Sequence, residues 1–306
     1  MAVIGIDLGG TKVAAAIFNA DGEMLVKETR LLEGAGSDAA GDLIVEVVRS
    51  LVAKQPDLHI DAVGICIPGI VYSKRETVWA PNIPGWDNYP LKKKITEGAG
   101  IDSLKVCIES DRTCYILGEV WKGAAKECEN AIYLAVGTGI GAGILLDGRI
   151  IHGANDIVGA TGWMALQPPY DHDWDRCGCF ETFASGNGIG LQAARLWNDS
   201  SKTSYDVFAL YGKDPVATQV LDKAIEMWGM GAANLVSLFN PEKVIFGGGV
   251  FGPAVKYIDR IYEEACKWGQ PISMRDVTFC ASAIQGEAAL LGAAALAIRE
   301  TNPQTL

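Results

Sequence analysis

Three glycine-rich turns in the sequence each come directly after an apolar segment of strand type. They are Asp7-Leu8-Gly9-Gly10-Thr11-Lys12, Gly137-Thr138-Gly139-Ile140-Gly141 and Gly247-Gly248-Gly249. Glycine lets a backbone approach an anion closely, and backbone N–H groups with a hydroxyl can then hold phosphate oxygens. One such turn alone could be a plain hairpin turn, but three after three strands favour phosphate binding. Asp7 could in addition orient Mg²⁺ through water.

Asp111 is the candidate for proton transfer. It lies where a strand over 104–108 passes into a helix that runs to about residue 122. A helix N-terminus stabilises a carboxylate, so we expect Asp111 to be ionised at neutral pH with a low pKa. It could then accept the proton of a substrate hydroxyl whose oxygen attacks a γ-phosphate. From its position alone, a structural N-cap is the favoured interpretation.

The elements around these turns repeat. A strand, a Gly/Thr turn, a strand, an Asp-Gly turn and a third strand occur over 2–28 and again over 131–152. Such a repeat suggests two domains of like fold, and strands that alternate with helices indicate an α/β architecture. We expect one domain over 1–117 plus 288–306 and a second over 118–287. Helices are predicted over 38–54, 187–198, 215–239, 252–268 and 284–299, the last packing back on the first domain.

The composition excludes several classes of function. The chain has 26 Lys and Arg against 37 Asp and Glu, a net charge of −11, which disfavours nucleic acid or membrane as a partner. The N-terminus has no secretory signal pattern, and the apolar run over 288–298 is too short to span a bilayer. Eight scattered cysteines favour reduced thiols in a cytoplasm over a disulfide framework.

These motifs together resemble the ROK family (repressor, open reading frame, kinase) of sugar kinases. The resemblance covers essentially the whole chain and keeps the family order. The matching segments are Asp7 to Lys12, Pro81 to Trp86, Ser110-Asp111 with Leu117 to Glu119, Val136 to Gly141, Gly178 to Glu181 and Phe246 to Gly249.

The resemblance implies two actin-like, ribonuclease H-like domains around a central nucleotide-binding cleft, with ATP and Mg²⁺ as donor and cofactor. It makes Asp111 the catalytic base and implies a sugar hydroxyl as the acceptor; a homodimer is also expected from it. The nucleotide and Mg²⁺ would be held by Asp7, Gly9, Gly10, Thr11, Lys12, Gly137, Thr138, Gly139, Gly247, Gly248 and Gly249. The acceptor would be held by Asn82, Ser110, Asp111, Trp163 and Glu181.

Two family motifs are altered. The sugar-binding Glu-x-Gly-His reads Ala160-Thr161-Gly162-Trp163, and the zinc motif reads His172 to Cys179 with only Cys179 retained as a ligand. A structural zinc is therefore not expected, because Trp cannot coordinate the metal; an irregular site of His172, Cys177 and Cys179 is the alternative. Loss of two polar contacts favours an acceptor other than plain glucose, such as a modified, deoxy or amino sugar, a less common sugar or a cyclitol. Trp163 either stacks on this acceptor or only fills space.

The leading hypothesis is an ATP-dependent kinase acting on a sugar or sugar-like polyol. A catalytically weak, sugar-binding regulator derived from such kinases is the alternative, motivated by the lost Glu and His and opposed by the retained Asp111. Kinase action on a non-carbohydrate alcohol is a third possibility. The family repressors carry an extra N-terminal DNA-binding module, and a first strand that starts at residue 2 leaves no room for one.

Overall fold

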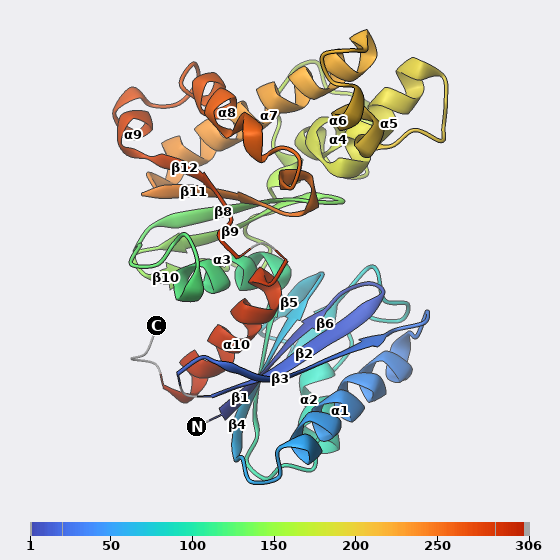
Figure 1. Cartoon of the computed structure of the whole chain (residues 1–306), viewed down its shortest axis with the longest axis vertical. Coiled ribbons are helices and arrows are strands. Elements are labelled where there is room, and N and C mark those ends of the chain that lie inside the picture. Colours follow the sequence, from blue (N-terminus) through green and yellow to red (C-terminus); the bar gives the residue numbers. More distant parts are fainter. Residues whose placement is uncertain (1, 20, 285, 303–306) are drawn as a thin grey trace. The chain divides into compact units, whose positions relative to one another are not determined.

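The computed structural model describes residues 2–19, 21–284 and 286–302 (Figure 1). Its backbone contacts divide the chain into two compact units. The first comprises Met1–Lys126, His152–Ile157 and Gly286–Leu306, and the second comprises Glu127–Ile151 and Val158–Gln285. The domain boundary expected after residue 117 falls inside helix α3 (Asp111–Lys122), and this helix belongs entirely to the first unit.

The first unit is built on a five-stranded sheet of order β3-β2-β1-β4-β7. The chain enters as an antiparallel meander and then adds two parallel strands. The strands are β1 (Ala2–Leu8), β2 (Lys12–Asn19), β3 (Met24–Leu31), β4 (Ile60–Ile67) and β7 (Lys105–Ser110). A separate hairpin of β5 (Ile70–Tyr72) and β6 (Thr77–Trp79), absent from the sequence prediction, follows β4. The helices are α1 (Ser37–Lys54), α2 (Leu91–Gly98), α3 and α10 (Ala288–Thr301).

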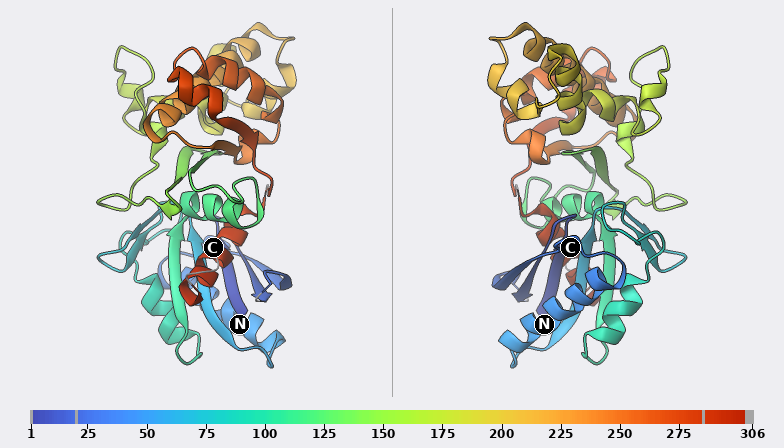
Figure 2. Two further views of the ribbon diagram at one scale, coloured as in Figure 1. Left: turned by 90° about the vertical axis from the view of Figure 1, so that its left-hand side faces the viewer. Right: turned by 90° about the vertical axis from the view of Figure 1, so that its right-hand side faces the viewer.

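Helix α10 contacts β1 and β4 although it follows them by more than two hundred residues along the chain, and Figure 1 shows it (red) beside these blue strands. Gly5 and Gly64 are cross-strand neighbours that make this approach possible. A Cβ on Gly64 would lie only 1.9 Å from the carbonyl oxygen of Ala293. Side chains alternate along a strand, so the residues flanking Gly5, Ile4 and Ile6, point to the other face and pack in the core that includes α1. Figure 2 shows α1 and α10 on opposite sides of the sheet.

The second unit repeats this sheet. Its order, β10-β9-β8-β11-β12, again joins an antiparallel meander to two parallel strands. The predicted internal repeat is thus confirmed at the level of topology. The strands are β8 (Ala131–Val136), β9 (Ile140–Leu146), β10 (Arg149–Ile150), β11 (Lys243–Gly247) and β12 (Thr278–Ala281).

Helix α7 (Pro215–Phe239) is the central helix of the second unit. It has the predicted bounds because Asp214 caps its N-terminus, Pro215 occupies the first turn and Asn240 ends it in the left-handed conformation. It contacts the other helices of this unit, which are α4 (Cys179–Ala184), α5 (Gly186–Trp197), α6 (Ser204–Leu210), α8 (Ile258–Ala265) and α9 (Pro271–Asp276). The short 3₁₀ helices are η1 (Thr161–Trp163), η2 (His172–Trp174), η3 (Gly249–Phe251) and η4 (Val255–Tyr257).

Two helix predictions need correction. The helix expected over 252–268 is α-helical only as α8, because 3₁₀ turns occupy much of the segment before it. The helix expected from 284 begins at Ala288. Within the described part of the chain, no helix has both the length and the apolar character needed to cross a bilayer.

Candidate active site

The first glycine-rich turn connects β1 to β2 in the first unit. The N–H of Gly9 donates to the carbonyl oxygen of Lys12 over 2.9 Å, which closes the turn. Gly10, Thr11 and Lys12 are exposed at its tip. A Cβ on Gly10 would lie 3.2 Å from the Cβ of Asn82, so the fold places this loop against Asn82, a predicted acceptor residue more than seventy positions away.

Asp7 lies at the carboxyl end of β1, below this turn, and is partly buried. Burial raises the pKa of its carboxyl group, against the lowering effect of the Lys12 charge and of a hydrogen bond with the Cys66 side chain. The desolvated carboxylate would gain from a cation nearby, as expected of a group that orients Mg²⁺.

Ser110 and Asp111 stand at the junction of β7 and α3. Ser110 is the N-cap of α3, since its Oγ accepts from the N–H of Thr113 at 3.4 Å. Asp111 is therefore not the N-cap of this helix, because it is the first helical residue and the cap is its neighbour Ser110. Its Oδ1 accepts from the N–H of Arg112 at 2.8 Å.

The expected low pKa of Asp111 is also wrong. Desolvation raises its pKa from 3.8 to about 6, and the lowering effects of the Arg112 charge and of backbone hydrogen bonds at the helix N-terminus do not compensate. The negative charge of Asp7 raises the pKa further. The fold thus brings two predicted carboxylates of the first unit within electrostatic reach of each other, and leaves Asp111 mainly ionised, yet protonatable, near neutral pH.

A cavity of 530 Å³ in the second unit gathers part of the predicted nucleotide site. Gly137, Thr138 and Gly249 line it. A Cβ on Gly137 or Gly249 would meet no atom within 4 Å, so both backbones face open space that a ligand could enter. The predicted residues of two separate turns thereby share one cavity.

Other residues of this cavity carry no motif and were missed from the sequence. They include Asn187, Lys202, Thr203, Ser204, Tyr205 and Phe208. Tyr205 is 81% exposed and comes from the start of α6, whereas Asn187 comes from the start of α5. An aromatic ring, an amide and several hydroxyls beside glycine backbones can hold a base, a ribose and phosphates. The one sequence feature near these residues is the glycine-rich segment Ser185-Gly186-Asn187-Gly188, but its pattern is that of an ordinary helix start and does not indicate a binding site.

Three of the five predicted glycines in the second unit do not line this cavity. Gly247 packs on the ring of Tyr133, where a Cβ would lie 1.8 Å from the hydroxyl oxygen. Gly248 has φ of +88° and lies against the Val136 backbone, so it serves the turn itself. A Cβ on Gly139 would lie 2.6 Å from Oε2 of Glu181, which places this glycine at the predicted acceptor residue instead.

Glu181 is held by the second glycine-rich turn. Its Oε2 accepts from the N–H of Ile140 at 2.7 Å, and desolvation nevertheless raises its pKa. A Cβ on Gly162 would lie 2.9 Å from the same oxygen. Trp163 follows Gly162 in η1, and its indole is 58% exposed. Glu181, Gly139 and the altered sugar-binding motif thus form one cluster within the second unit.

The ROK family model matches residues 3–300 of this chain. The chain belongs to the ROK family. A glucokinase of Halalkalibacterium halodurans is 32% identical over 273 residues, 81% of this chain and 80% of that protein. A xylose repressor of Caldicellulosiruptor bescii is 31% identical over 265 residues, 80% of this chain and 65% of that protein.

Solved ROK structures agree with the fold. A ROK hexokinase from Thermus thermophilus superposes with a TM-score of 0.84 at 29% identity, covering 99% of this chain and 100% of that one. A ROK family glucokinase from Streptomyces griseus, solved with glucose and AMPPNP, has a TM-score of 0.74 at 30% identity, covering 97% of this chain and 99% of that one. The two α/β units therefore have the actin-like fold of this family.

The segment that replaces the ROK zinc motif forms an aromatic and polar loop. His172 interacts with Asp175 over 3.3 Å, and the thiol of Cys177 contacts the hydroxyl of Thr182 at 3.4 Å. Cys179 is buried at the start of α4. Within residues 2–19, 21–284 and 286–302, no cluster of three His, Cys, Asp or Glu side chains could hold a metal ion. The irregular site of His172, Cys177 and Cys179 is thus not formed, and the expectation of no zinc stays a prediction.

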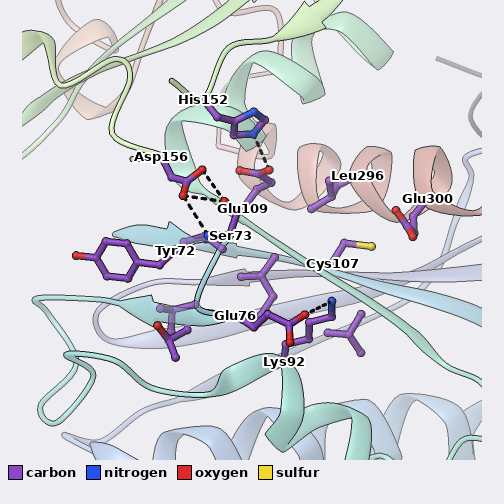
Figure 3. Close-up of a pocket in the computed structure, with 15 residues that line it drawn as sticks. Tyr72, Ser73, Glu76, Lys92, Cys107, Glu109, His152, Asp156, Leu296 and Glu300 are labelled. Carbon is purple, nitrogen blue, oxygen red and sulfur yellow. Dashed lines mark hydrogen bonds and ion pairs between the residues drawn. The ribbon is translucent and has the colours of Figure 1, made fainter. Parts of the chain in front are cut away.

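A further cavity, of 510 Å³, lies in the first unit beside β7 (Figure 3). Most of the charged side chains in it have a partner among the residues that line it. Glu109 contacts His152 at 2.8 Å and Glu76 contacts Lys92 at 3.2 Å, while Asp156 accepts from the Ser73 hydroxyl. The contacts of His152 and Asp156 connect the segment His152–Ile157 to the first unit. None of the predicted site residues lines this cavity.

Proposed function

We propose that this ROK protein is an ATP-dependent kinase that phosphorylates a hydroxyl group of a sugar or sugar-like polyol. The observation that carries the proposal is the desolvated carboxyl group of Asp111 at the start of α3, within electrostatic reach of Asp7 and in the same unit as Asn82. A carboxylate with a pKa of about 6 is a stronger proton acceptor than an ordinary aspartate and is still ionised at neutral pH.

The proposed chemistry is an in-line transfer. Asp111 orients the acceptor hydroxyl and takes its proton while the hydroxyl oxygen bonds to the γ-phosphorus. The bond between that phosphorus and the β,γ-bridging oxygen breaks, so ADP leaves with the electron pair. We propose that the acceptor is held by Asn82, Ser110 and Glu181. Transfer requires the acceptor hydroxyl to reach the γ-phosphate of the bound nucleotide during turnover.

The nucleotide is proposed to bind in the 530 Å³ cavity, with its base near Tyr205 and its phosphates near Gly137, Thr138 and Gly249. The first turn, Gly9 to Lys12, is proposed to hold the remaining phosphate oxygens. Mg²⁺ would neutralise charge on the phosphates, and Asp7 is the residue proposed to orient it.

We further propose that the acceptor is not unmodified glucose. The motif that supplies Glu and His in the family pattern supplies Ala160 and Trp163 here. A sugar hydroxyl that would pair with that Glu or His has no such partner here, and an unpaired hydroxyl in the site costs binding energy. The retained Glu181 carboxylate can still accept hydrogen bonds from substrate hydroxyls. A polyhydroxyl substrate therefore fits the site better than an alcohol with a single hydroxyl.

The kinase proposal is tested by ADP release over a panel of hexoses, amino sugars, deoxy sugars and cyclitols. We expect turnover with at least one acceptor, and a loss of about 10³-fold or more in Asp111→Asn. Asp57→Asn, at an exposed aspartate of the same unit, is the matched control and should retain activity. Wild-type rates in Asp111→Asn would overturn the assignment of the base.

The similarity to a xylose repressor supports a second candidate, a sugar-binding regulator. It predicts saturable sugar binding by calorimetry with no ADP release from any acceptor in the panel. Turnover above the rate of ATP hydrolysis without acceptor would exclude it.

A further inference from the structure

A cavity of 440 Å³ in the second unit has an aromatic wall that the proposed chemistry does not use. The large apolar side chains of this wall are Trp163, Pro168, Tyr170 and Trp174, and its polar side chains include Gln167 and Asp175. It occupies the segment where the altered zinc motif lies. We call it the aromatic pocket.

The aromatic pocket adjoins the residue proposed to hold the acceptor. Gly178 lines the pocket, and a Cβ on it would lie 2.4 Å from the Cα of Trp163. The residue before Trp163 is Gly162, and a Cβ on Gly162 would lie 2.9 Å from a carboxylate oxygen of Glu181. Two consecutive residues therefore connect the two features: Gly162 lies against Glu181, and the side chain of Trp163 lines the pocket.

Two of the aromatic side chains in the wall, Trp163 and Tyr170, are exposed, and contacts with other residues of the wall hold Tyr170 in place. Trp163 is 58% exposed and Tyr170 is 66% exposed, although burial of such rings would be favourable. The Tyr170 hydroxyl donates to Asp175, and its ring meets Trp174 edge to face at 6.1 Å. An exposed ring that is already held in place, such as that of Tyr170, loses little conformational entropy when a flat ligand covers it.

The polar groups of the pocket indicate the chemistry of the ligand. The only charged side chain in the wall is Asp175, and its carboxylate already accepts from Tyr170 and contacts His172. A phosphate would be repelled, and a second sugar ring would have few partners for its hydroxyls. A neutral, flat and apolar group fits best.

We infer that the aromatic pocket binds an apolar aglycone, such as an aryl group, on the acceptor sugar. The inference rests on the proposed kinase function and specifies its substrate as a glycoside. The sugar ring is held at Glu181, and its aglycone is placed against Trp163 and Tyr170.

The test compares glucose, mannose, galactose and N-acetylglucosamine, each as methyl and phenyl glycosides of both anomers. On the accepted ring we expect kcat/KM for the phenyl glycoside to exceed that for the methyl glycoside by about tenfold. Trp163→Ala and Tyr170→Ala should each reduce this ratio to near one, and Trp163→Phe should keep most of it. Trp268→Ala is the control, because Trp268 is also 58% exposed in the same unit and does not line the pocket.

Equal rates for phenyl and methyl glycosides, or a ratio unchanged in Trp163→Ala, would overturn the inference. Preference for the disaccharide cellobiose over phenyl glucoside would also overturn it, in favour of a second sugar ring. A direct titration without ATP separates this inference from the kinase proposal: phenyl glycosides should change the tryptophan fluorescence of the wild type but not of Trp163→Ala. If no acceptor releases ADP yet this titration saturates, the kinase proposal fails and the pocket stands. If the titration is flat, the pocket inference fails whatever the turnover.

Discussion

Replacing the proposed base should stabilise the protein while it removes the activity. The pKa of Asp111 in the fold is about 6, against 3.8 for an ordinary aspartate. The difference, about 2.2 units at about 1.4 kcal/mol each, corresponds to at most about 3 kcal/mol of stability that the charged carboxylate costs near pH 8. Asp111→Asn removes the charge and keeps an oxygen that can accept from Arg112, so we expect a higher melting temperature.

The pH dependence of this effect follows from the direction of the shift. A carboxyl group with a raised pKa in the folded state destabilises the protein when it is ionised, and this cost disappears as pH falls through 6 toward 3.8. The advantage of Asp111→Asn over the wild type should therefore be largest above pH 7 and should fall to about half by pH 5. The catalytic rate of the wild type should fall over the same range, because the protonated carboxyl group cannot accept a proton.

Thermal unfolding at pH 8 and pH 5, followed by calorimetry, measures the stability difference between Asp111→Asn and the wild type and its dependence on pH. A gain of 1 kcal/mol raises the melting temperature by about 2–4 °C in a domain of this size. Asp57→Asn should show no comparable gain at either pH, because Asp57 is exposed. A melting temperature of Asp111→Asn at or below that of the wild type at pH 8, or a gap that does not narrow at pH 5, would refute the reasoning.

Two further predictions concern the nucleotide cavity and an ion-pair cluster. Tyr205→Ala should raise the KM for ATP about two- to tenfold with little change in kcat, whereas Trp268→Ala, outside that cavity, should leave this KM unchanged in the same steady-state assay. Burial alone would raise the pKa of Glu28, but hydrogen bonds from Lys54 and neighbouring groups outweigh it and lower the pKa to about 2. Glu28→Gln should therefore cost up to about 3 kcal/mol above pH 4.5 and progressively less toward pH 2, as followed by urea unfolding at pH 7 and pH 3. Glu46→Gln, at a side chain that is 62% exposed, should have little effect at either pH.

Much of the fold could be predicted from local signals. Helix α7 ends where Asp214, Pro215 and Asn240 place its caps, and the repeated strand and turn pattern corresponds to two sheets of the same order. The hairpin β5–β6 and helices α4, α6 and α9 were missed, because elements this short carry too few periodic positions to stand out.

Some residues of the candidate site could likewise be predicted from the sequence, and others could not. Asp7, Asp111 and the glycine-rich turns could be found because strand ends and tight turns leave a mark in residue type and spacing. Tyr205 and Asn187 could not, because each lies at an ordinary helix start and shares a cavity with Gly137 only after the chain has folded. Gly139 and Gly248 looked equivalent to Gly137, yet one packs on Glu181 and the other on the Val136 backbone.

The α/β class, the repeated sheet, the family and the position of the carboxylate at residue 111 could all be predicted without a structure, because hydrophobic period, turn chemistry and motif order are local properties. The pKa of that carboxyl group and the residues around it, in contrast, depend on how the chain packs in three dimensions. Its pKa depends on burial and on the charge of Asp7, and the wall of the aromatic pocket depends on how the loop around Tyr170 folds beside Trp163. Solvent exclusion and charge proximity act through space, so they arise only when distant segments pack together.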